Sequence, residues 1–381
     1  DVWCYNFSGN NLQARIKAFI KFYNTEVKRF GASSKKVSPE SFVIRDLTRI
    51  SWNRNALQDL KKGKEYEFSK ANIYKALYRP FSKTNFYFSK QLNAMTYQNF
   101  KLFPNPNTIN RIISVTGIGS KDGLSTIMSD VIADLNLLKG GAQCFPLRIF
   151  EKQEAGDSLF ANQSESEDFI VSDVITDDGL QLFLDAYSDK TFKKEDLFYY
   201  IYGLLHSPDY RERFQNNLSK ELPRIPAVNS FEDFMAFSKA GRKLGDLHVN
   251  YETVEPFPVT FKEGDLRLAD ISDPKSFYRV KKTKFASKQD KATVFYNNNL
   301  TIQYIPLEAY DYIVNGKSAL DWVMERQCVK TDKESGIVND ANDYANETMN
   351  NPAYPLELFQ RVITVSLETI KIVRSLPKMV I

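Results

Sequence analysis

The amino-acid sequence predicts an α+β fold with mixed or antiparallel sheets and several amphipathic helices, arranged as two lobes behind an N-terminal helical linker. Residues 11–30 repeat apolar side chains at the spacing of one helix face. After residue 88 the apolar period shortens toward two, which is typical of strands. Residues 292–305 place an Asn-rich turn between two apolar runs, as in a hairpin. A chain of 381 residues is also long for a single core.

We expect three segments along the chain. Residues 1–60 form the helical linker. Residues 61–192 form a first α+β lobe, which includes an acidic variable segment at 151–190. Residues 193–381 form a helical segment and a second α+β lobe that ends in a C-terminal helix.

The linker begins with the helix over 11–30, which Asn10 or Asn11 can cap and Gly31 can end. Its outer face is basic and suits solvent or a phosphate backbone. Residues 42–47 have strand character, and residues 52–60 predict a short helix.

The stretch from 61 to 88 combines lysines with aromatic residues. Ile73 and Leu77 are four residues apart behind a possible cap at Ser69, which predicts a short helix. The pattern breaks at Pro80 and resumes at 86–88 as an aromatic strand. Interleaved basic and aromatic side chains suit a surface that meets a phosphate backbone, and the alternative is a solvated lysine face over a buried strand.

Strands are expected at 112–116, 132–138 and 144–150, separated by Gly and Asn turns. The glycines at 117, 119 and 123 predict a turn, because no Lys-Ser/Thr pair or GxGxxG pattern accompanies them, and a loop that cradles a phosphate is the less favoured alternative. Residues 151–190 are acidic and poorly periodic, which indicates a flexible excursion, with a carboxylate metal site as the alternative.

Helices return after residue 193. One helix places apolar residues over 197–204, and Ser207-Pro208 then caps a second helix that stops before Pro223. Ser230 opens a third helix, which we expect to end near 241–245. His206 lies between these elements and is expected to be a hydrogen-bonded structural histidine.

The last third predicts a second α+β unit. Residues 276–286 alternate like a strand and precede the hairpin. Residues 306–314 and the Ser318-capped segment 319–327 predict two helices. A final helix is expected from Pro355 to about Leu376.

Charge is distributed unevenly although the net charge is only +4. Residues 1–90 hold 18 Lys and Arg against 7 Asp and Glu, an excess of 11. Residues 275–291 hold seven basic residues against one acid, whereas 151–200 hold 4 against 13. A basic lobe beside an acidic one suggests a polyanionic partner, although such runs can be solvated faces or lysine-protected edge strands.

The sequence lacks the residue patterns that several classes of protein function require. Three widely spaced cysteines and two histidines predict neither a disulfide framework nor a zinc site. The sequence has no Asn/Asp-Pro-Pro-Tyr/Phe motif for amino-methyl transfer, no Walker motif and no Gly-x-Ser-x-Gly. We therefore expect no catalytic site, cofactor or metal in this chain. It has no run of about 18 apolar residues, so no membrane partner is expected and the cytoplasm is the simplest location. The start at Asp1 suggests a fragment of a longer protein.

An ordered set of segments resembles one known family. The segments are LYRPFSKTNFYF (77–88), VTGIGSKDGLSTIMSDVIADLNLL (115–138) with QCFPL (143–147), FYYIYGLLHSPDYRERF (198–214) with PRIP (223–226), GDLHVNYE (245–252), the stretch 305–340, and NPAYPLELFQRVITVSLETIKIV (351–373). Together they look like the C-terminal specificity (target-recognition) region of type ISP enzymes, which are single-polypeptide, type I-like restriction-modification enzymes. Related segments occur in fused type IIG restriction–methyltransferases.

The resemblance implies sequence-specific recognition of double-stranded DNA in the cytoplasm of a bacterium. Family enzymes join a nuclease, a helicase-type ATPase, an adenine methyltransferase and a target recognition domain, so this chain carries only the last. Its partners would be double-stranded DNA and the methyltransferase and helicase domains of the same polypeptide. S-adenosylmethionine, ATP and Mg would bind the missing domains. The chain would present a target adenine to the methyltransferase, which flips the base out.

Candidate DNA-binding residues follow from local charge and from the family segments. Phosphate contacts are expected from basic side chains, which fix register without reading sequence: Lys61, Lys62, Lys64, Arg79, Lys83, Arg211, Arg213, Lys281, Lys282 and Lys284. Base readers are expected in residues 89–111 or in the turn region 286–299; in the first of these segments they are Lys90, Gln91, Asn93, Gln98, Asn99 and Lys101.

Two interpretations of the function of this chain remain open. In the first, the chain is a DNA-recognition module, and its basic stretches at 61–90 and 275–291 face one positive cleft. In the second, it is a structural coupler that docks on the methyltransferase and helicase domains and reads little DNA itself. Arg79, Arg211 and Arg213 also lie in the family segments, and the alternative to a phosphate contact is that each arginine braces a buried carboxylate.

Overall fold

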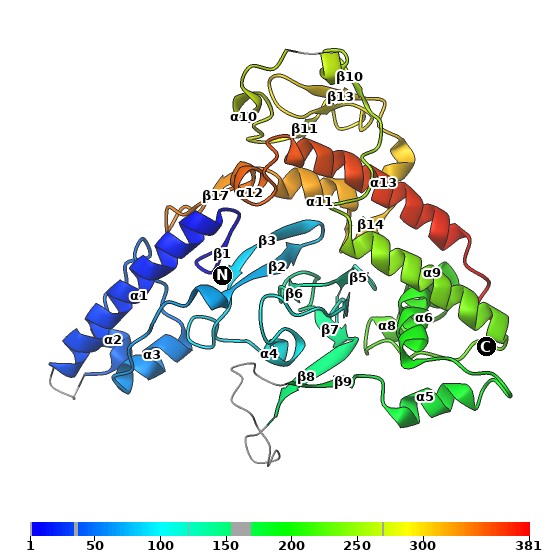
Figure 1. Ribbon diagram of the computed structural model, residues 1–381, viewed down its shortest axis with the longest axis horizontal. Helices are drawn as coiled ribbons and strands as arrows, with labels where there is room; N and C mark the ends of the chain where they lie inside the picture. The colour runs from blue at the N-terminus through cyan, green and yellow to red at the C-terminus, as the bar shows by residue number, and fades with distance from the viewer. Residues whose placement is uncertain (1, 34–36, 121, 154–168, 269) are drawn as a thin grey trace, which may run out of the picture.

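The computed structural model describes residues 2–33, 37–120, 122–153, 169–268 and 270–381. A central sheet lies in the middle of the molecule (Figure 1), with α1 to one side, α11 and α13 above it and α6 and α9 on the opposite side. Small antiparallel sheets surround this centre. The predicted α+β class with mixed or antiparallel sheets is confirmed.

The N-terminal helix α1 (Gly9–Gly31) forms as the apolar repeat predicts. Its cap is Ser8, whose hydroxyl accepts a hydrogen bond from the Asn11 amide at 3.0 Å, and not Asn10 or Asn11. Two short helices, α2 (Pro39–Phe42) and α3 (Arg54–Lys61), pack beside it. Residues 43–47 form no strand, which corrects that expectation.

The central sheet has the order β1-β3-β2-β6. Its strands are β1 (Tyr5–Asn6), β2 (Ile73–Arg79), β3 (Ser82–Tyr87) and β6 (Ile132–Ala133), and β6 is parallel to β2. The predicted helix over 73–77 is wrong. The segment is a strand because every residue from Ile73 to Leu77 pairs with the aromatic strand β3, and a 3₁₀ turn at Lys70–Asn72 precedes it.

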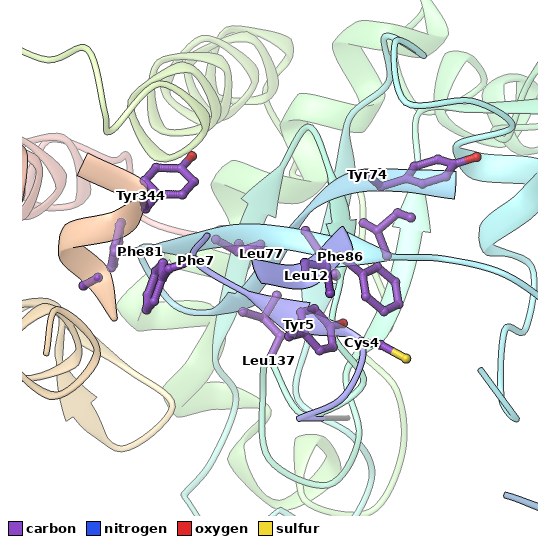
Figure 2. Close-up of a cluster of buried hydrophobic side chains, with 14 of the residues drawn as sticks. Cys4, Tyr5, Phe7, Leu12, Tyr74, Leu77, Phe81, Phe86, Leu137 and Tyr344 are labelled. Carbon is purple, nitrogen blue, oxygen red and sulfur yellow. The ribbon is translucent and has the colours of Figure 1, made fainter. Parts of the chain in front are cut away.

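Aromatic side chains from distant segments fill the core on this sheet. Figure 2 shows Tyr5, Phe86 and Leu77 close together, with Leu12 from α1 beside them. The rings of Tyr5 and Phe86 stack with centroids 4.3 Å apart. Strand β1, within the expected linker, is thus part of the central sheet.

A second sheet, β5-β4-β7, follows the first along the chain. Its strands β4 (Ile112–Val115), β5 (Thr126–Ser129) and β7 (Gln143–Pro146) are antiparallel, and α4 (Asn99–Leu102) precedes them. The expected strand over 132–138 is confined to β6, because residues 134–139 turn toward Gly140. A Cβ at Gly117 would lie 2.0 Å from the Gly140 carbonyl oxygen, so only glycine fits this contact.

The acidic segment 151–190 contains regular structure that its composition hides. Strand β8 (Arg148–Lys152) pairs with β9 (Phe169–Asp173), and α5 (Asp177–Leu184) follows. Thr176 caps α5 by accepting from the Gly179 amide at 3.0 Å. The expectation of an unstructured excursion is therefore wrong for 169–184, and residues 154–168 lie outside the described residues.

Helices α6 (Lys194–His206), α7 (Pro208–Arg213), α8 (Gln215–Leu218) and α9 (Phe231–Val249) form the right-hand side of Figure 1. The helix expected between Ser207 and Pro223 is split into α7 and α8. Helix α9 continues past the expected end at 241–245, because Gly241 there packs against the backbone of α6 and Gly245 against Met128 of β5, and neither ends the helix.

The last third carries the sheet β10-β13-β12-β11 at the top of Figure 1. The expected hairpin is confirmed, whereas only the end of the expected strand over 276–286 forms. Its elements are α10 (Pro274–Phe277), β10 (Thr260–Phe261), β11 (Lys284–Phe285), β12 (Val294–Phe295) and β13 (Thr301–Gln303), with a 3₁₀ turn at Leu266–Leu268.

Residues 306–314 form a 3₁₀ turn (Leu307–Tyr310) and strand β14 (Ile313–Val314) instead of the expected helix. Pairing with β15 (Lys317–Ser318) draws this segment into a hairpin. The remaining elements are α11 (Ala319–Arg326), β16 (Val329–Thr331), β17 (Val338–Asp340), α12 (Ala341–Glu347) and α13 (Tyr354–Arg374). Both α11 and α13 form as predicted.

Buried apolar residues gather in two clusters. The larger joins residues from 3–138 with residues from 251–365, and the smaller joins 113–128 with 183–249 and Met379. The predicted lobe boundaries at 60 and 192 stay predictions. Within the described ranges, every helix is too short or too polar to cross a membrane.

Candidate nucleic-acid interface

The lysines at 61, 62 and 64 lie at the end of α3 and are exposed. Asn53 caps helix α3, because its side chain accepts a hydrogen bond from the Ala56 amide at 2.8 Å, and this cap fixes where the helix begins. Lys64 lies 3.6 Å from Asp59, an exposed ion pair that contributes little. Lys61 and Lys62 are among the residues that line an open cavity of about 1110 Å³ between α1, α2 and α3.

The second basic stretch is held in a fixed position against the β16–β17 hairpin. The Lys281 carbonyl accepts from the Val329 amide at 3.1 Å. Arg279 pairs with Asp340 at 2.5 Å, and the amide and carbonyl of Val280 bond to the Asn342 side chain at 2.9 and 2.8 Å. Because the backbone is anchored from both sides, the exposed side chains of Lys281 and Lys282 project from a rigid ledge.

Strand β11 carries Lys284, the next exposed lysine of this stretch. Lys284 stands opposite Phe295 of β12, and strand order places β11 at an edge of its sheet. A lysine on an edge strand also protects that edge from pairing with another chain. Its prediction as a phosphate contact remains open.

Two further basic residues, which the sequence reading did not select, lie next to this ledge. Lys330 is exposed on β16, the strand that bonds to Lys281, and Arg326 is at the end of α11. No local pattern could have revealed them, because 49 residues separate Lys281 from Lys330 along the chain. Only the pairing of distant segments brings them together.

Helix α1 and the segment after it carry further exposed basic residues near the β16–β17 turn. A cavity of about 470 Å³ lies between α1 and the β16–β17 turn, and Lys21 and Arg49 are among its lining residues. Arg49 lies over the Phe22 ring, 4.1 Å from the centroid, and both basic residues are exposed. We call Lys21, Arg49, Lys330, Lys281 and Lys282 the basic strip. For Lys21, the signal in the sequence was the exposed basic face of α1.

Arg79 and Lys83 have carboxylate partners within the protein. Arg79 pairs with Asp134 at 2.7 Å, and the two side chains are only 14% and 8% exposed. Lys83 lies 3.2 Å from Asp130 and 3.4 Å from Glu252. These pairs tie the turn between β2 and β3 to neighbouring segments. Their predicted phosphate contacts stay untested, and the structure gives both residues a bracing role.

The arginines of α7 differ from each other. Arg211 is half-buried, and its Nε donates to the Leu205 carbonyl at 2.7 Å. Burial lowers the pKa of the Arg211 guanidinium. Arg213 is exposed, with its guanidinium 5.9 Å from the Phe214 centroid. The structure does not bring either residue into the basic strip.

The segment 89–111 offers exposed polar and aromatic groups. Lys101 is exposed and pairs with Glu151 at 2.7 Å, whereas Gln91 and Asn93 are half-buried. Asn93 accepts from the Ser89 amide at 2.8 Å and therefore supports the local turn. Lys90 and Gln98 are exposed, and Asn99 begins α4.

Tyr97 is a residue in this segment that the sequence reading overlooked. Its φ is +44°, in the left-handed region that a bulky residue rarely adopts, and its side chain is 65% exposed. Met95, two residues earlier, is 61% exposed. Strain of this kind recurs at functional sites.

The turn region 286–299 uses its asparagines for its own structure. Asn297 accepts from the amides of Asn299 and Leu300 at 2.8 and 2.9 Å, and its amide donates to the carbonyls of Phe277 and Arg279. These side chains are less available for base contacts than the exposed residues 288 and 289.

The geometry as a whole suits binding of a polyanion. Among the residues that the structure describes, no three or more His, Cys, Asp or Glu side chains are grouped to hold a metal ion. The basic strip combines fixed backbone, exposed ammonium groups and one stacked guanidinium.

Comparisons with known proteins agree with the resemblance. A family model described as the type ISP C-terminal specificity domain matches residues 1–358. A comparison with curated proteins finds no match.

Three solved structures are similar over nearly the whole chain. A nuclease-deletion mutant of the type ISP restriction-modification enzyme LlaGI, in complex with a DNA substrate mimic, is 33% identical with a TM-score of 0.82 over 99% of this chain. The ATP-dependent type ISP enzyme LlaBIII bound to DNA is 31% identical with a TM-score of 0.84 over 100%. A DrdV–DNA complex is 29% identical with a TM-score of 0.79 over 100%. This chain spans 32%, 22% and 35% of those three chains.

Proposed function

This chain belongs to the family of type ISP C-terminal specificity domains, and on that basis we propose that it recognises a specific sequence in double-stranded DNA. Recognition would position a target adenine for a methyltransferase domain that this chain does not contain. The observation that carries the proposal is its similarity along its whole length to enzymes solved with DNA, at 31% and 33% identity.

The basic strip is the surface we assign to the phosphate backbone. Its lysines are exposed, and the backbone of residues 280 and 281 is anchored by Asn342 and by β16. Phosphate contacts of this kind orient the duplex and carry no sequence information. Lys61, Lys62 and Lys64 extend the surface along the α1–α3 arm, where each is exposed.

Base reading is assigned to the segment 89–111. It holds the exposed Gln98 and Lys101 and the half-buried Gln91, whose amide and ammonium groups match base edges in the major groove, and Lys101 would exchange its Glu151 partner for a base. Tyr97 adds an exposed aromatic ring on a strained backbone. One well-made bidentate contact is worth ~1–3 kcal/mol against a wrong base.

A specific observation favours the coupler as the second candidate. Arg79 and Lys83 are engaged by Asp134, Asp130 and Glu252, so these residues brace the fold. Two of the predicted phosphate contacts are thus occupied by carboxylates of the chain itself, which leaves fewer basic side chains for DNA. The coupler predicts that the basic strip is covered by the methyltransferase or helicase domains.

The activities of a whole enzyme are likewise proposals for this chain. We propose that the methyltransferase, helicase and nuclease domains, with S-adenosylmethionine, ATP and Mg, belong to the same polypeptide in the bacterial cytoplasm. This chain by itself would be no enzyme.

Selection from a random duplex pool tests the function. The 381-residue chain is mixed with the pool, bound duplexes are sequenced, and affinities are measured by fluorescence anisotropy over a salt series. We expect an enriched motif and a steep loss of affinity with salt, since released counterions drive phosphate contacts. Salt-sensitive binding without a motif would favour a nonspecific clamp, and absence of binding near physiological salt would favour the coupler.

A further inference from the structure

A pocket of about 310 Å³ lies between the central sheet and the β16–β17 hairpin. Its wall combines strand β3, the end of β2 and the segment that joins α11 to β16. The chain segments that meet there are more than 240 residues apart in sequence. The lining residues are Val2, Phe7, Tyr78, Ser82, Thr84, Arg326, Cys328, Lys330, Thr331, Asp332, Ile337 and Asn339.

Two buried polar atoms of the lining residues have no hydrogen-bond partner among the described residues. They are the Ser82 hydroxyl oxygen and Arg326 Nε. Ser82 is only 1% exposed, so its hydroxyl group is withdrawn from bulk water. An unsatisfied buried donor destabilises a fold, which makes a pocket with two such residues in its lining a candidate site for a bound acceptor.

The Arg326 side chain is fixed in place. Its Nη2 donates to Glu325 at 2.9 Å, and its guanidinium lies 5.6 Å and 5.9 Å from the ring centroids of Trp322 and Tyr78. A guanidinium held by neighbours loses little freedom when it binds an oxyanion. Nε of Arg326 is therefore part of a guanidinium group that is already held in position.

The pocket has two cationic side chains in its wall, and one of them, Arg326, is also paired with Glu325 at 2.9 Å. Arg326 and Lys330 line it, against Asp332 as the one carboxylate of the described lining residues. Oδ1 of Asp332 already accepts from the amide and hydroxyl of Ser335, at 2.8 and 2.7 Å. Burial raises the pKa of the Cys328 thiol and the Glu325 charge adds to that rise, whereas the charges of Lys330, Arg326 and Lys282 act against it.

We propose that this pocket binds a tetrahedral oxyanion through Ser82, Arg326 and Lys330. Its position beside Lys281 and Lys282 makes a phosphate of the DNA backbone the first source, an assignment that rests on the proposed function. Free phosphate is the other source of the same chemistry. Hydroxyl, guanidinium and ammonium donors converging on one oxyanion form the charge-assisted bonds that bind phosphate most strongly.

The test uses two variants that leave the stacked Arg326 intact. Ser82→Ala removes a hydroxyl that bonds to no described residue, and Lys330→Gln removes an exposed charge. Thr126→Val is the control for the first, because its hydroxyl is also buried and unpartnered among the described residues but lies outside the pocket. Lys243→Gln, an exposed lysine on α9, is the control for the second.

Inorganic phosphate is the first probe, compared with chloride at equal ionic strength. We expect phosphate to raise the Tm of the unsubstituted chain and of both controls by roughly 2 °C or more. The rise should fall below half in Ser82→Ala and in Lys330→Gln.

Duplex binding over a salt series is the second probe. In Lys330→Gln the slope of log K against log salt should shrink by about 0.9, the value for one phosphate contact. Ser82→Ala should weaken binding about 3- to 10-fold. Loss of the phosphate effect with unchanged duplex binding would support the pocket with free phosphate as its source.

The inference is overturned if neither variant differs from its control with either probe. Failure of the unsubstituted chain to bind any duplex would instead contradict the proposed function. The phosphate experiment would then decide the pocket independently.

Discussion

Gly241 on α9 lies so close to Tyr199 on α6 that a Cβ at position 241 would be 1.9 Å from the Tyr199 carbonyl oxygen. Gly203 on α6 makes the reciprocal contact, since a Cβ there would be 2.2 Å from the Phe237 carbonyl oxygen. The two helices therefore touch backbone to backbone. Their contact fixes the smaller of the two core clusters.

Gly241→Ala should separate these helices. Overpacking of this kind costs roughly 1–3 kcal/mol, and backbone atoms cannot yield as a flexible side chain does. We expect a clear fall in the thermal midpoint. Gly31→Ala is the matched control, because no atom lies within 4 Å of a Cβ at this helix end. Equal midpoints for the two variants would contradict the account of α6–α9 packing.

Arg79→Ala should destabilise the chain by roughly 3 kcal/mol, because it leaves the buried carboxylate of Asp134 without its cation. Arg213→Ala removes an exposed arginine and should change stability by less than about 0.5 kcal/mol. Chemical denaturation measures both. If Arg79→Ala left the stability unchanged but lowered the affinity for DNA, the result would support a phosphate contact for Arg79 and contradict its bracing role.

Stability should fall as the pH drops below about 6.5. Burial lowers the pKa of His206 well below its usual range and that of His248 to about 3. The unfolded chain then binds protons that the folded chain refuses, at a cost of about 1.4 kcal/mol per pH unit for each histidine. The loss begins near the unfolded pKa of about 6.5 and continues until the folded pKa is reached.

The window between pH 6.5 and 5 is the one to measure, since carboxylates begin to titrate below it. His206→Asn can keep the hydrogen bond that His206 Nδ1 gives to the Tyr202 carbonyl at 2.8 Å, while removing one titrating group. Its thermal midpoint should depend less on pH. An unchanged pH dependence would show that His206 is not buried neutral.

The Lys281→Gln/Lys282→Gln double variant should bind duplex DNA more weakly at all sequences. Two lost phosphate contacts reduce the salt slope by about 1.8. Lys239→Gln/Lys243→Gln removes the same charge from exposed positions on α9 and should leave the slope unchanged. Fluorescence anisotropy over a salt series measures the duplex affinities of the two double variants. Equal losses in the two double variants would indicate a diffuse charge effect and no localised strip.

Sequence reasoning found the long periodic elements and missed those defined by distant partners. Helices α1, α11 and α13 were predictable because each carries an apolar stripe of its own. Strand β2 was not predictable, because Ile73 and Leu77 also fit the spacing of a helix. Only the pairing of this segment with β3 makes it a strand. Glycines at 241 and 245 suggested a helix end, although their function is close packing.

The candidate site was predictable only where local charge marks it. Lys281 and Lys282 stand out in a basic run, and the structure places them on an anchored ledge. Lys330 and Arg326 belong to a segment with no such signal and join the site through tertiary pairing. Partners such as Asp134 for Arg79 are equally invisible in sequence, because 55 residues separate them.

The central claim is sequence-specific recognition of duplex DNA, and competition binding tests it most directly. The 381-residue chain, bound to a labelled duplex that carries the selected motif, is challenged at physiological salt with the same duplex unlabelled and with a scrambled duplex of equal length. The account predicts that the scrambled duplex competes at least about 10³-fold more weakly. Equal competition by the two duplexes would contradict it.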